Sequence, residues 1–336
     1  MPNHLYNPTS FKLSVFLFRM NNKEPVLVSI ILTLYNKKSY VESAIFSVYE
    51  QTYKNWELII LDDCSSDWSF EVAMSFIEKL WISNKVRLIK NTKNLWLNEN
   101  TKKWFKLSKW KYVCLLDADD VFVRNKLEKC VIFCEENSAD FVYSHLSQID
   151  WNGIIKKKIF DIRHWKKYGI KRIIPLWLAT ASSIFLKDEI AKEIVNIWFP
   201  PREIYQDQWI CLCTSILWFK IWFIDEPLVL YRSTPWNMSY IENFSNENIL
   251  KNWELFFANT KIKYISIKEK IQIDKSLEDY VCKGIKLCDE YLKYLKWKHI
   301  FPSYKLLYMS FNNEYMCFTC RLPILICRKF IQSFNK

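Results

Sequence analysis

The N-terminal half of the chain alternates short apolar runs with segments whose apolar residues recur at helical spacing. Residues 26–33 form a continuous apolar run of the kind that buried parallel strands show, and residues 39–51 follow with helical spacing. The alternation continues in three further strand-like runs, 56–61, 86–90 and 112–116, and two helical segments, 69–82 and 100–108. Strands that alternate with helices predict an α/β fold with a mostly parallel central sheet and helices on both faces.

The pattern changes after Asp120. Further strands are expected at 141–144, 154–160 and 221–231, and further helices at 126–136 and 208–217. From about residue 245 onward the chain is helical in pattern and dense in lysine. We therefore expect a polar and basic leader at 1–24, an α/β domain at 25–240 and a helical C-terminal region at 241–336.

Composition excludes several classes of protein. The chain has 336 residues, of which 50% are hydrophobic and 25% are charged, as in a globular protein. No apolar run reaches the roughly 18 to 20 residues of a membrane-spanning helix, so the protein is expected to be soluble or peripheral to a membrane. The eleven cysteines are an odd number and are scattered, which is typical of free thiols in a reducing compartment. A cytoplasmic location is therefore expected.

The balance of glycine and tryptophan is abnormal. Ordinary glycine usage would give roughly 24 glycines in a chain of this length, yet there are 3 glycines and 16 tryptophans. Several tryptophans stand in turn-like contexts, such as Trp151, which precedes Asn152 and Gly153. We hypothesise that UGA codons, read as glycine in the source, have been translated as tryptophan. The alternative is a tryptophan-rich surface that binds a ligand.

The hypothesis makes a specific prediction about individual positions. The tryptophans expected to be encoded by UGA are Trp68, Trp96, Trp104, Trp110, Trp151, Trp177, Trp218, Trp222, Trp236 and Trp297. Trp56 instead begins an apolar strand and is expected to be a genuine aromatic residue. Several of the ten should be exposed in turns, some of them at positive φ, where a bulky side chain is strained.

Carboxylates follow two of the predicted strands. The strand at 112–116 leads into Asp117, Asp119 and Asp120, and the strand at 56–61 leads into Asp62 and Asp63. In an open α/β sheet the ligand crevice lies at the carboxyl ends of the strands. An Asp-x-Asp sequence can bind one hard divalent cation, and through it a diphosphate. Aspartate clusters also form ordinary surface turns, and the residues after Asp63 could cap a helix.

Several motifs, in the same order along the chain, resemble family 2 glycosyltransferases with the glycosyltransferase A fold, of the bacterial cell-surface polysaccharide type. The resemblance rests on residues 28–36, 43–53, 56–67, 94–97 and 109–120 and covers about residues 26–236. The family usually has glycine where Trp68, Trp96, Trp104 and Trp110 stand, and where Cys64 stands. The resemblance therefore makes residues 25–240 a glycosyltransferase catalytic domain.

The resemblance also implies roles for individual residues. Thr33 and Tyr35 would line the nucleotide pocket, and Asp63 would face the uracil. Asp117 would lie near the ribose and the metal, and Asp119 would ligate a divalent metal, Mg²⁺ or Mn²⁺.

A later motif implies the catalytic base. Asp207 fits the aspartate that begins a later helix in the family, and Gln206 replaces the usual acidic neighbour. Thr234 stands where the family often has a histidine, so no metal ligand is expected from that loop.

These roles agree with the chemistry of glycosyl transfer. The enzyme must neutralise charge on a departing diphosphate and remove a proton from the acceptor hydroxyl. Asp119 with a metal answers the first need and Asp207 the second. We therefore expect an inverting transfer, by single displacement, from a UDP-sugar to a glycan or lipid-linked acceptor.

Two other functions remain as alternatives: a catalytically inert relative, or a nucleic-acid-binding protein with a basic and aromatic surface. The net charge of +12 is compatible with the second, but the lysines are spread along the predicted helices, and we expect no nucleic-acid partner. A peripheral contact with the inner face of the membrane is expected instead, partly through the region beyond about residue 300. The alternative for that region is a helix packed against the catalytic domain. The donor sugar, the acceptor, the linkage and the oligomeric state do not follow from the sequence.

Overall fold

The structure is a computed structural model that describes residues 26–107, 111–159, 179–197, 204–233, 246–273 and 275–296. The chain divides into two compact units. The first consists of Met1–Arg163 with Ala179–Glu242, and the second of His164–Leu178 with Asn243–Lys336. Among the described residues, no helix is both long enough and apolar enough to cross a membrane.

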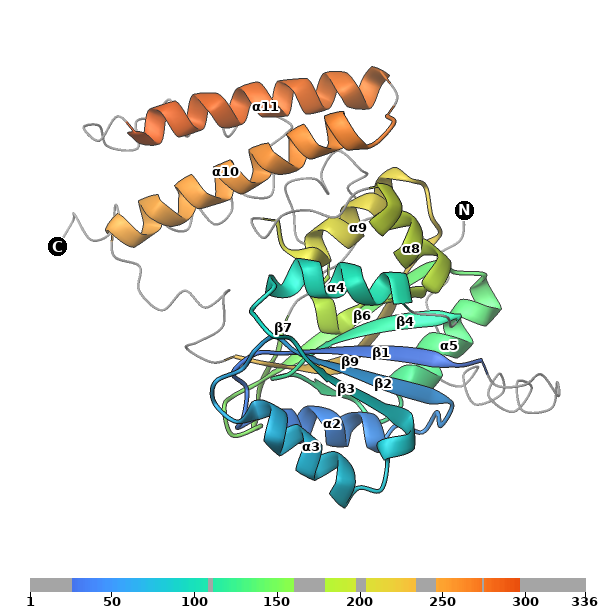
Figure 1. Cartoon of the computed structure of the whole chain (residues 1–336). Coiled ribbons are helices and arrows are strands. Elements are labelled where there is room, and N and C mark those ends of the chain that lie inside the picture. Colours follow the sequence, from blue (N-terminus) through green and yellow to red (C-terminus); the bar gives the residue numbers. More distant parts are fainter. Residues whose placement is uncertain are drawn as a thin grey trace. The chain divides into compact units, whose positions relative to one another are not determined.

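The first unit is built on a nine-stranded sheet with the order β3-β2-β1-β4-β8-β6-β9-β5, in which β7 pairs with β6 (Figure 1). Its strands are β1 (Val28–Leu34), β2 (Trp56–Asp62), β3 (Val86–Lys90), β4 (Tyr112–Asp117), β5 (Val121–Phe122), β6 (Phe141–Ile149), β7 (Ile155–Ile159), β8 (Phe185–Lys187) and β9 (Ile221–Arg232). Strands β3, β2, β1 and β4 are mutually parallel. Strand β8 is antiparallel to both β4 and β6, and β6 is parallel to β9. The expected α/β fold with a mostly parallel sheet is confirmed.

Helices cover both faces of this sheet, with α2 and α3 on one face and α4, α8 and α9 on the other (Figure 1). The helices of the unit are α2 (Val41–Tyr49), α3 (Ser69–Lys79), α4 (Trp96–Leu107), α5 (Lys126–Asn137), α8 (Asp188–Ile197) and α9 (Gln206–Ile216). Two short 3₁₀ turns, η1 (Ser83–Lys85) and η2 (Ala181–Ser183), complete it.

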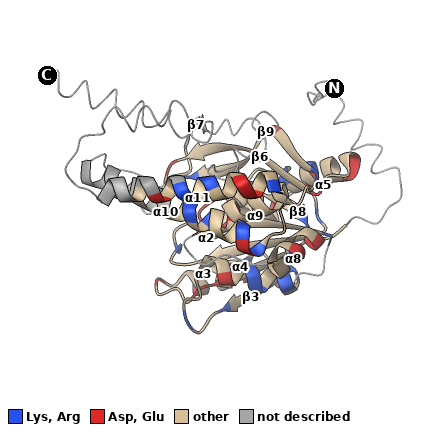
Figure 2. Ribbon diagram, turned by 90° about the horizontal axis from the view of Figure 1, so that it is seen from above, with Lys and Arg blue, Asp and Glu red and all other residues tan. Residues whose placement is uncertain are grey.

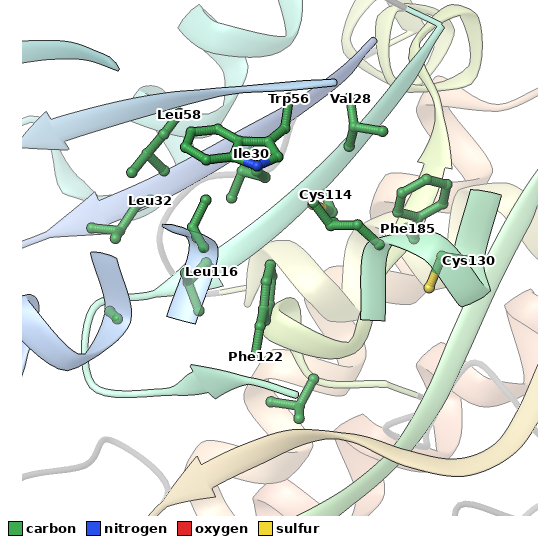
Figure 3. Close-up of a cluster of buried hydrophobic side chains, with 14 of the residues drawn as sticks. Val28, Ile30, Leu32, Trp56, Leu58, Cys114, Leu116, Phe122, Cys130 and Phe185 are labelled. Carbon is green, nitrogen blue, oxygen red and sulfur yellow. The ribbon is translucent and has the colours of Figure 1, made fainter. Parts of the chain in front are cut away.

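The core follows from the two-residue period of the strands. In β1, Val28, Ile30 and Leu32 point to one face and join Trp56 and Phe122 in a buried cluster (Figure 3). Ile31, which lies between Ile30 and Leu32 in the strand, points to the opposite face and is also completely buried. Strand β1 is therefore covered on both sides, which explains why its sequence is a continuous apolar run.

Three elements differ from the sequence expectation. Helix α4 begins at Trp96 rather than at residue 100, because the Asp63 carboxylate accepts the N–H groups of Leu95 and Trp96 at the helix start. Strand β6 continues to Ile149 rather than ending at residue 144, because β7 and β9 pair with its second half. Helix α8 was not expected from the sequence.

The tryptophan backbone conformations match part of the glycine hypothesis. Trp68, Trp96 and Trp218 have φ of 70°, 66° and 60°, and Trp81, which the hypothesis did not name, has φ of 56°. The four indoles are between 52% and 91% exposed. Together they make up four of the seven non-glycine residues with positive φ in the described part of the chain. The expected exposed tryptophans at positive φ are therefore found, while the codon assignment stays a prediction.

The other named tryptophans behave differently. Trp151 is exposed without a positive φ, and Trp222 is partly buried against the ring of Phe133. Trp104 is buried in the middle of α4, so it is not among the exposed tryptophans. Trp56 is buried at the start of β2, as expected of a genuine aromatic residue. The positions outside the described residues are Trp110, Trp177, Trp236 and Trp297.

The described part of the second unit is a pair of helices, α10 (Asn246–Lys270) and α11 (Lys275–Lys296). A Cβ at Gly284 would lie 2.5 Å from the ring of Tyr264, so the two helices approach closely at this glycine. Lys261 and Asp289 form an ion pair of 2.5 Å between the helices. The expected membrane contact beyond residue 300 falls outside the described residues.

Basic side chains occur on several elements and are interspersed with acidic ones in the described residues (Figure 2).

Candidate functional site

The carboxyl ends of β1, β2 and β4 meet at one edge of the sheet. In register, Thr33 of β1 lies opposite Asp117 of β4, and Leu34 lies opposite Asp62 of β2. The polar residues after each strand are therefore brought together, as the sequence predicted for a ligand crevice. Thr33 and Asp117 are 3.5 Å apart between Oγ1 and Oδ1. Tyr35, just beyond β1, is 48% exposed at the same edge.

Asp63 is buried and engaged by backbone groups. Its Oδ1 accepts the N–H of Leu95 at 2.7 Å and the side-chain amide of Asn91 at 3.0 Å, and its Oδ2 accepts the N–H of Trp96 at 2.9 Å. These bonds tie the end of β2 to the start of α4. They give Asp63 a structural role beside the uracil contact that the resemblance implies.

The loop after β4 is held by three side chains from elsewhere in the chain. The Asp117 N–H donates to Ser182 Oγ at 3.0 Å. Arg232 donates from its backbone N–H to Asp120 Oδ1 at 2.9 Å and from Nε to the carbonyl of Asp119 at 2.8 Å. Lys37 Nζ lies 2.6 Å from Asp119 Oδ2. Ser182 and Arg232 thus hold the backbone around the Asp-x-Asp sequence, and Lys37 contacts the Asp119 carboxylate itself.

The carboxyl groups crowd one another electrostatically. Burial, together with the negative charges of Asp119 and Asp207, raises the pKa of Asp117 to about 7, and the ammonium of Lys37 partly offsets this. Burial and its two acidic neighbours also raise the pKa of Asp120 well above its ordinary value. A site with this excess of negative charge favours a bound cation.

Asp207 lies at the second position of α9 and is buried. Its Oδ1 accepts the N–H of Gln208 at 2.7 Å, and its charge contributes to the raised pKa of Asp117. The fold therefore brings Asp207 to the same site as the acids that follow β4. Gln206, the neighbour that departs from the family pattern, is buried and accepts a hydrogen bond from Thr101 of α4.

The residues at this edge suit a divalent metal that also binds a diphosphate. Carboxylate oxygens are the ligands that Mg²⁺ and Mn²⁺ prefer, and Asp119 is only 12% exposed in its side chain. Among the described residues, no group of three or more His, Cys, Asp or Glu side chains is arranged to hold a metal. A metal held by Asp119 would take further ligands from the diphosphate and from water, as Mg²⁺ does at phosphate sites.

The raised pKa of Asp117 predicts a pH dependence of stability. Above the ordinary aspartate pKa near 4, the folded protein keeps a proton that the unfolded chain has lost, and this advantage disappears as the pH rises to about 7. In wild-type protein without metal, the unfolding free energy should fall by about 3 kcal/mol between pH 5 and pH 8 because Asp117 loses its proton, and Asp117→Asn should abolish this part of the fall. Urea unfolding with a chelator at the two pH values measures this. An equal pH dependence in wild type and variant would contradict the assignment.

Sequence reasoning missed two residues of the site, Lys37 and Ser182. Lys37 follows the strand-end residues Tyr35 and Asn36 directly, so its position beside the crevice was a usable signal. Ser182 carried no signal, because it reaches Asp117 from 65 residues away, from the turn η2 that precedes the antiparallel strand β8.

Comparison with known sequences shows which protein family the chain belongs to. The model of the family described as Glycosyl transferase family 2 matches residues 29–191. A curated relative, the UDP-Glc:alpha-D-GlcNAc-diphosphoundecaprenol beta-1,3-glucosyltransferase WfgD of Escherichia coli, is 33% identical over 179 residues, which are 51% of this chain and 68% of that protein. The chain belongs to glycosyltransferase family 2. It is a nucleotide-sugar-dependent glycosyltransferase, and its homologues include bacterial polysaccharide glycosyltransferases.

Solved structures of other proteins show a similar fold. TarS residues 1–349 of S. aureus, in complex with UDP, align with a TM-score of 0.54 at 16% identity, covering 77% of this chain and 70% of that one. The mannosyltransferase PcManGT from Pyrobaculum calidifontis, in complex with GDP-Man and Mn²⁺, has a TM-score of 0.54 at 12% identity, covering 97% of this chain and 95% of that one. The expected glycosyltransferase A fold is confirmed.

Proposed function

We propose that this glycosyltransferase transfers a sugar from a UDP-sugar to a lipid-linked or glycan acceptor in a metal-assisted single displacement with inversion. The observation that carries the proposal is the meeting of Asp117, Asp119 and Asp207 at the carboxyl ends of the strands. The name of the Escherichia coli relative supports both a UDP donor and a lipid-linked acceptor. The Mn²⁺ bound in the Pyrobaculum calidifontis structure supports the metal.

The residues divide the chemistry between them. Asp207 takes the proton of the acceptor hydroxyl as its oxygen forms a bond to the anomeric carbon. The bond from that carbon to the diphosphate breaks at the same time, and its electron pair leaves on the nucleoside diphosphate. Since the sugar passes directly from one oxygen to the other, the anomeric configuration inverts. A divalent metal held by Asp119 would supply positive charge to the leaving diphosphate.

Thr33, Tyr35, Asp63 and Asp117 would bind the donor nucleotide. Thr33 and Asp117 are already in contact across β1 and β4, and Tyr35 is exposed beside them. Asp63 is fixed by the start of α4, so it can present its remaining lone pairs to a base without moving.

Replacement of Asp119 by asparagine tests the metal assignment. Asp119→Asn removes one formal charge and one cation ligand, so Mn²⁺-dependent binding of a UDP-sugar should fall at least about tenfold. Calorimetric titration of a panel of nucleotide sugars, with Mn²⁺ and with a chelator, measures the effect. Chelated wild type should resemble the variant. If Asp119→Asn binds the UDP-sugar as tightly as wild type in the presence of Mn²⁺, Asp119 is not the metal ligand.

A further inference from the structure

Lys37 places its ammonium on the carboxylate assigned to the metal. Its Nζ lies 2.6 Å from Asp119 Oδ2, and the two side chains are 23% and 12% exposed. This is a partly buried ion pair between the end of β1 and the loop after β4. No other cation is within salt-bridge distance of Asp119 among the described residues.

The backbone of Lys37 is fixed by hydrogen bonds, whereas its side chain is 23% exposed and ends in the ion pair with Asp119. The N–H of Lys37 donates to Ser69 Oγ at 2.8 Å, and its carbonyl accepts the N–H groups of Tyr40 and Val41 at 2.9 and 3.0 Å. The flexible four-carbon stem is therefore the part that can relocate the ammonium. A change at Asp119 would move the side chain without disturbing the loop.

An ammonium and a divalent cation cannot share the same carboxylate oxygen without strong repulsion. At the few ångströms that separate two ligands of one oxygen, the repulsion of a double and a single charge is large even in water. The charge of Lys37 also reaches Asp117, whose pKa it lowers against the effect of burial. In the donor-free protein, the ammonium therefore supplies part of the positive charge that a metal would supply.

We propose that Lys37 occupies the cation site of the donor-free enzyme and must be displaced from Asp119 before a divalent metal binds. The proposal rests on the assignment of Asp119 as a metal ligand under the proposed function. Because Lys37 must first leave Asp119, a divalent metal binds less tightly to the protein without donor. The diphosphate oxygens of the donor add ligands that compensate, so metal and donor bind best together.

Two neighbouring lysines allow a matched test. Lys37→Met removes the competing ammonium. Lys38→Met removes the same charge from the next residue. Lys38 is exposed, and its backbone N–H, which the substitution keeps, donates to Asp67. Mn²⁺ titration without donor, followed by electron paramagnetic resonance of free Mn²⁺, should show affinity raised about tenfold in Lys37→Met. Lys38→Met should change it less than about twofold, since exposed charges are screened.

The outcomes separate this proposal from the proposed function. Lys37→Gln should reproduce Lys37→Met, and Lys37→Arg should stay near wild type, with circular dichroism confirming the fold of each. If Asp119→Asn lowers Mn²⁺ affinity but Lys37→Met and Lys37→Gln leave it unchanged or weaker, the Lys37 proposal is overturned and the metal site stands. If Asp119→Asn binds Mn²⁺ as well as wild type, the metal assignment fails and the Lys37 proposal fails with it.

Discussion

Replacing Asp207 by asparagine should lower the rate of sugar transfer by about 10² to 10⁴, the usual contribution of a general base, while donor affinity changes little. Asparagine keeps the size of the side chain and still accepts a hydrogen bond from the Gln208 N–H, so the start of α9 should be preserved. The amide cannot take the proton of the acceptor hydroxyl. Steady-state transfer and calorimetric donor binding, measured on the same preparation, test both halves of the expectation.

Asp188 provides a matched control for Asp207. It is also a buried aspartate in the first turn of a helix, α8, but its N–H bonds to Lys111, before the start of β4 and so at the opposite edge of the sheet. Asp188→Asn should therefore leave the transfer rate within about twofold of wild type, because it lies outside the catalytic machinery. Asp207 loses the role of base if its variant weakens donor binding as strongly as it slows transfer.

The second large effect concerns stability. Trp68, Trp81, Trp96 and Trp218 have left-handed backbone conformations that cost an L-residue with a bulky side chain about 1 to 2 kcal/mol each. Glycine adopts this conformation without that cost, although it also loses more entropy on folding. We expect each Trp→Gly change to stabilise the protein by about 1 kcal/mol and the fourfold variant by about 4 kcal/mol, since the positions lie in separate segments. Urea unfolding measures the gain.

Other tryptophans serve as controls for this prediction. Trp151 is 67% exposed but lacks a positive φ, so Trp151→Gly should give no gain. Trp104 and Trp209 are fully buried, and their glycine variants should lose about 3 to 5 kcal/mol or more. A fourfold variant no more stable than the printed chain would contradict the glycine interpretation of these turns. The sequence of the gene gives the direct answer, because UGG codons at Trp68, Trp96 and Trp110 would overturn the interpretation.

The sequence allowed the strands and the acidic edge to be predicted because both are local signals. Apolar runs that end directly in Asp63 and Asp117 indicate a buried strand and the position of its carboxyl end. Trp68 and Trp96 stood out because turn positions favour glycine. The family motifs added Asp207, which periodicity alone would not have found.

The remaining features depend on contacts across long sequence distances. Arg232 reaches Asp120 from 112 residues away, and Lys37 reaches Asp119 from 82 residues away. The surroundings of α4 bury Trp104, which a local pattern cannot show. Helix α8 did carry a local signal, since Ile190, Ala191, Ile194 and Val195 recur at helical spacing.

The anomeric configuration of the released sugar tests the central claim most directly. When no acceptor is present, water can take the place of the acceptor hydroxyl, so early time points of a reaction with Mn²⁺ and a UDP-α-sugar are followed by proton NMR before the released sugar mutarotates. Direct displacement at the site formed by Asp119 and Asp207 predicts that the β-anomer forms first and that Asp207→Asn slows its formation. If the α-anomer formed first, with the configuration retained, the single-displacement account of this site would be wrong.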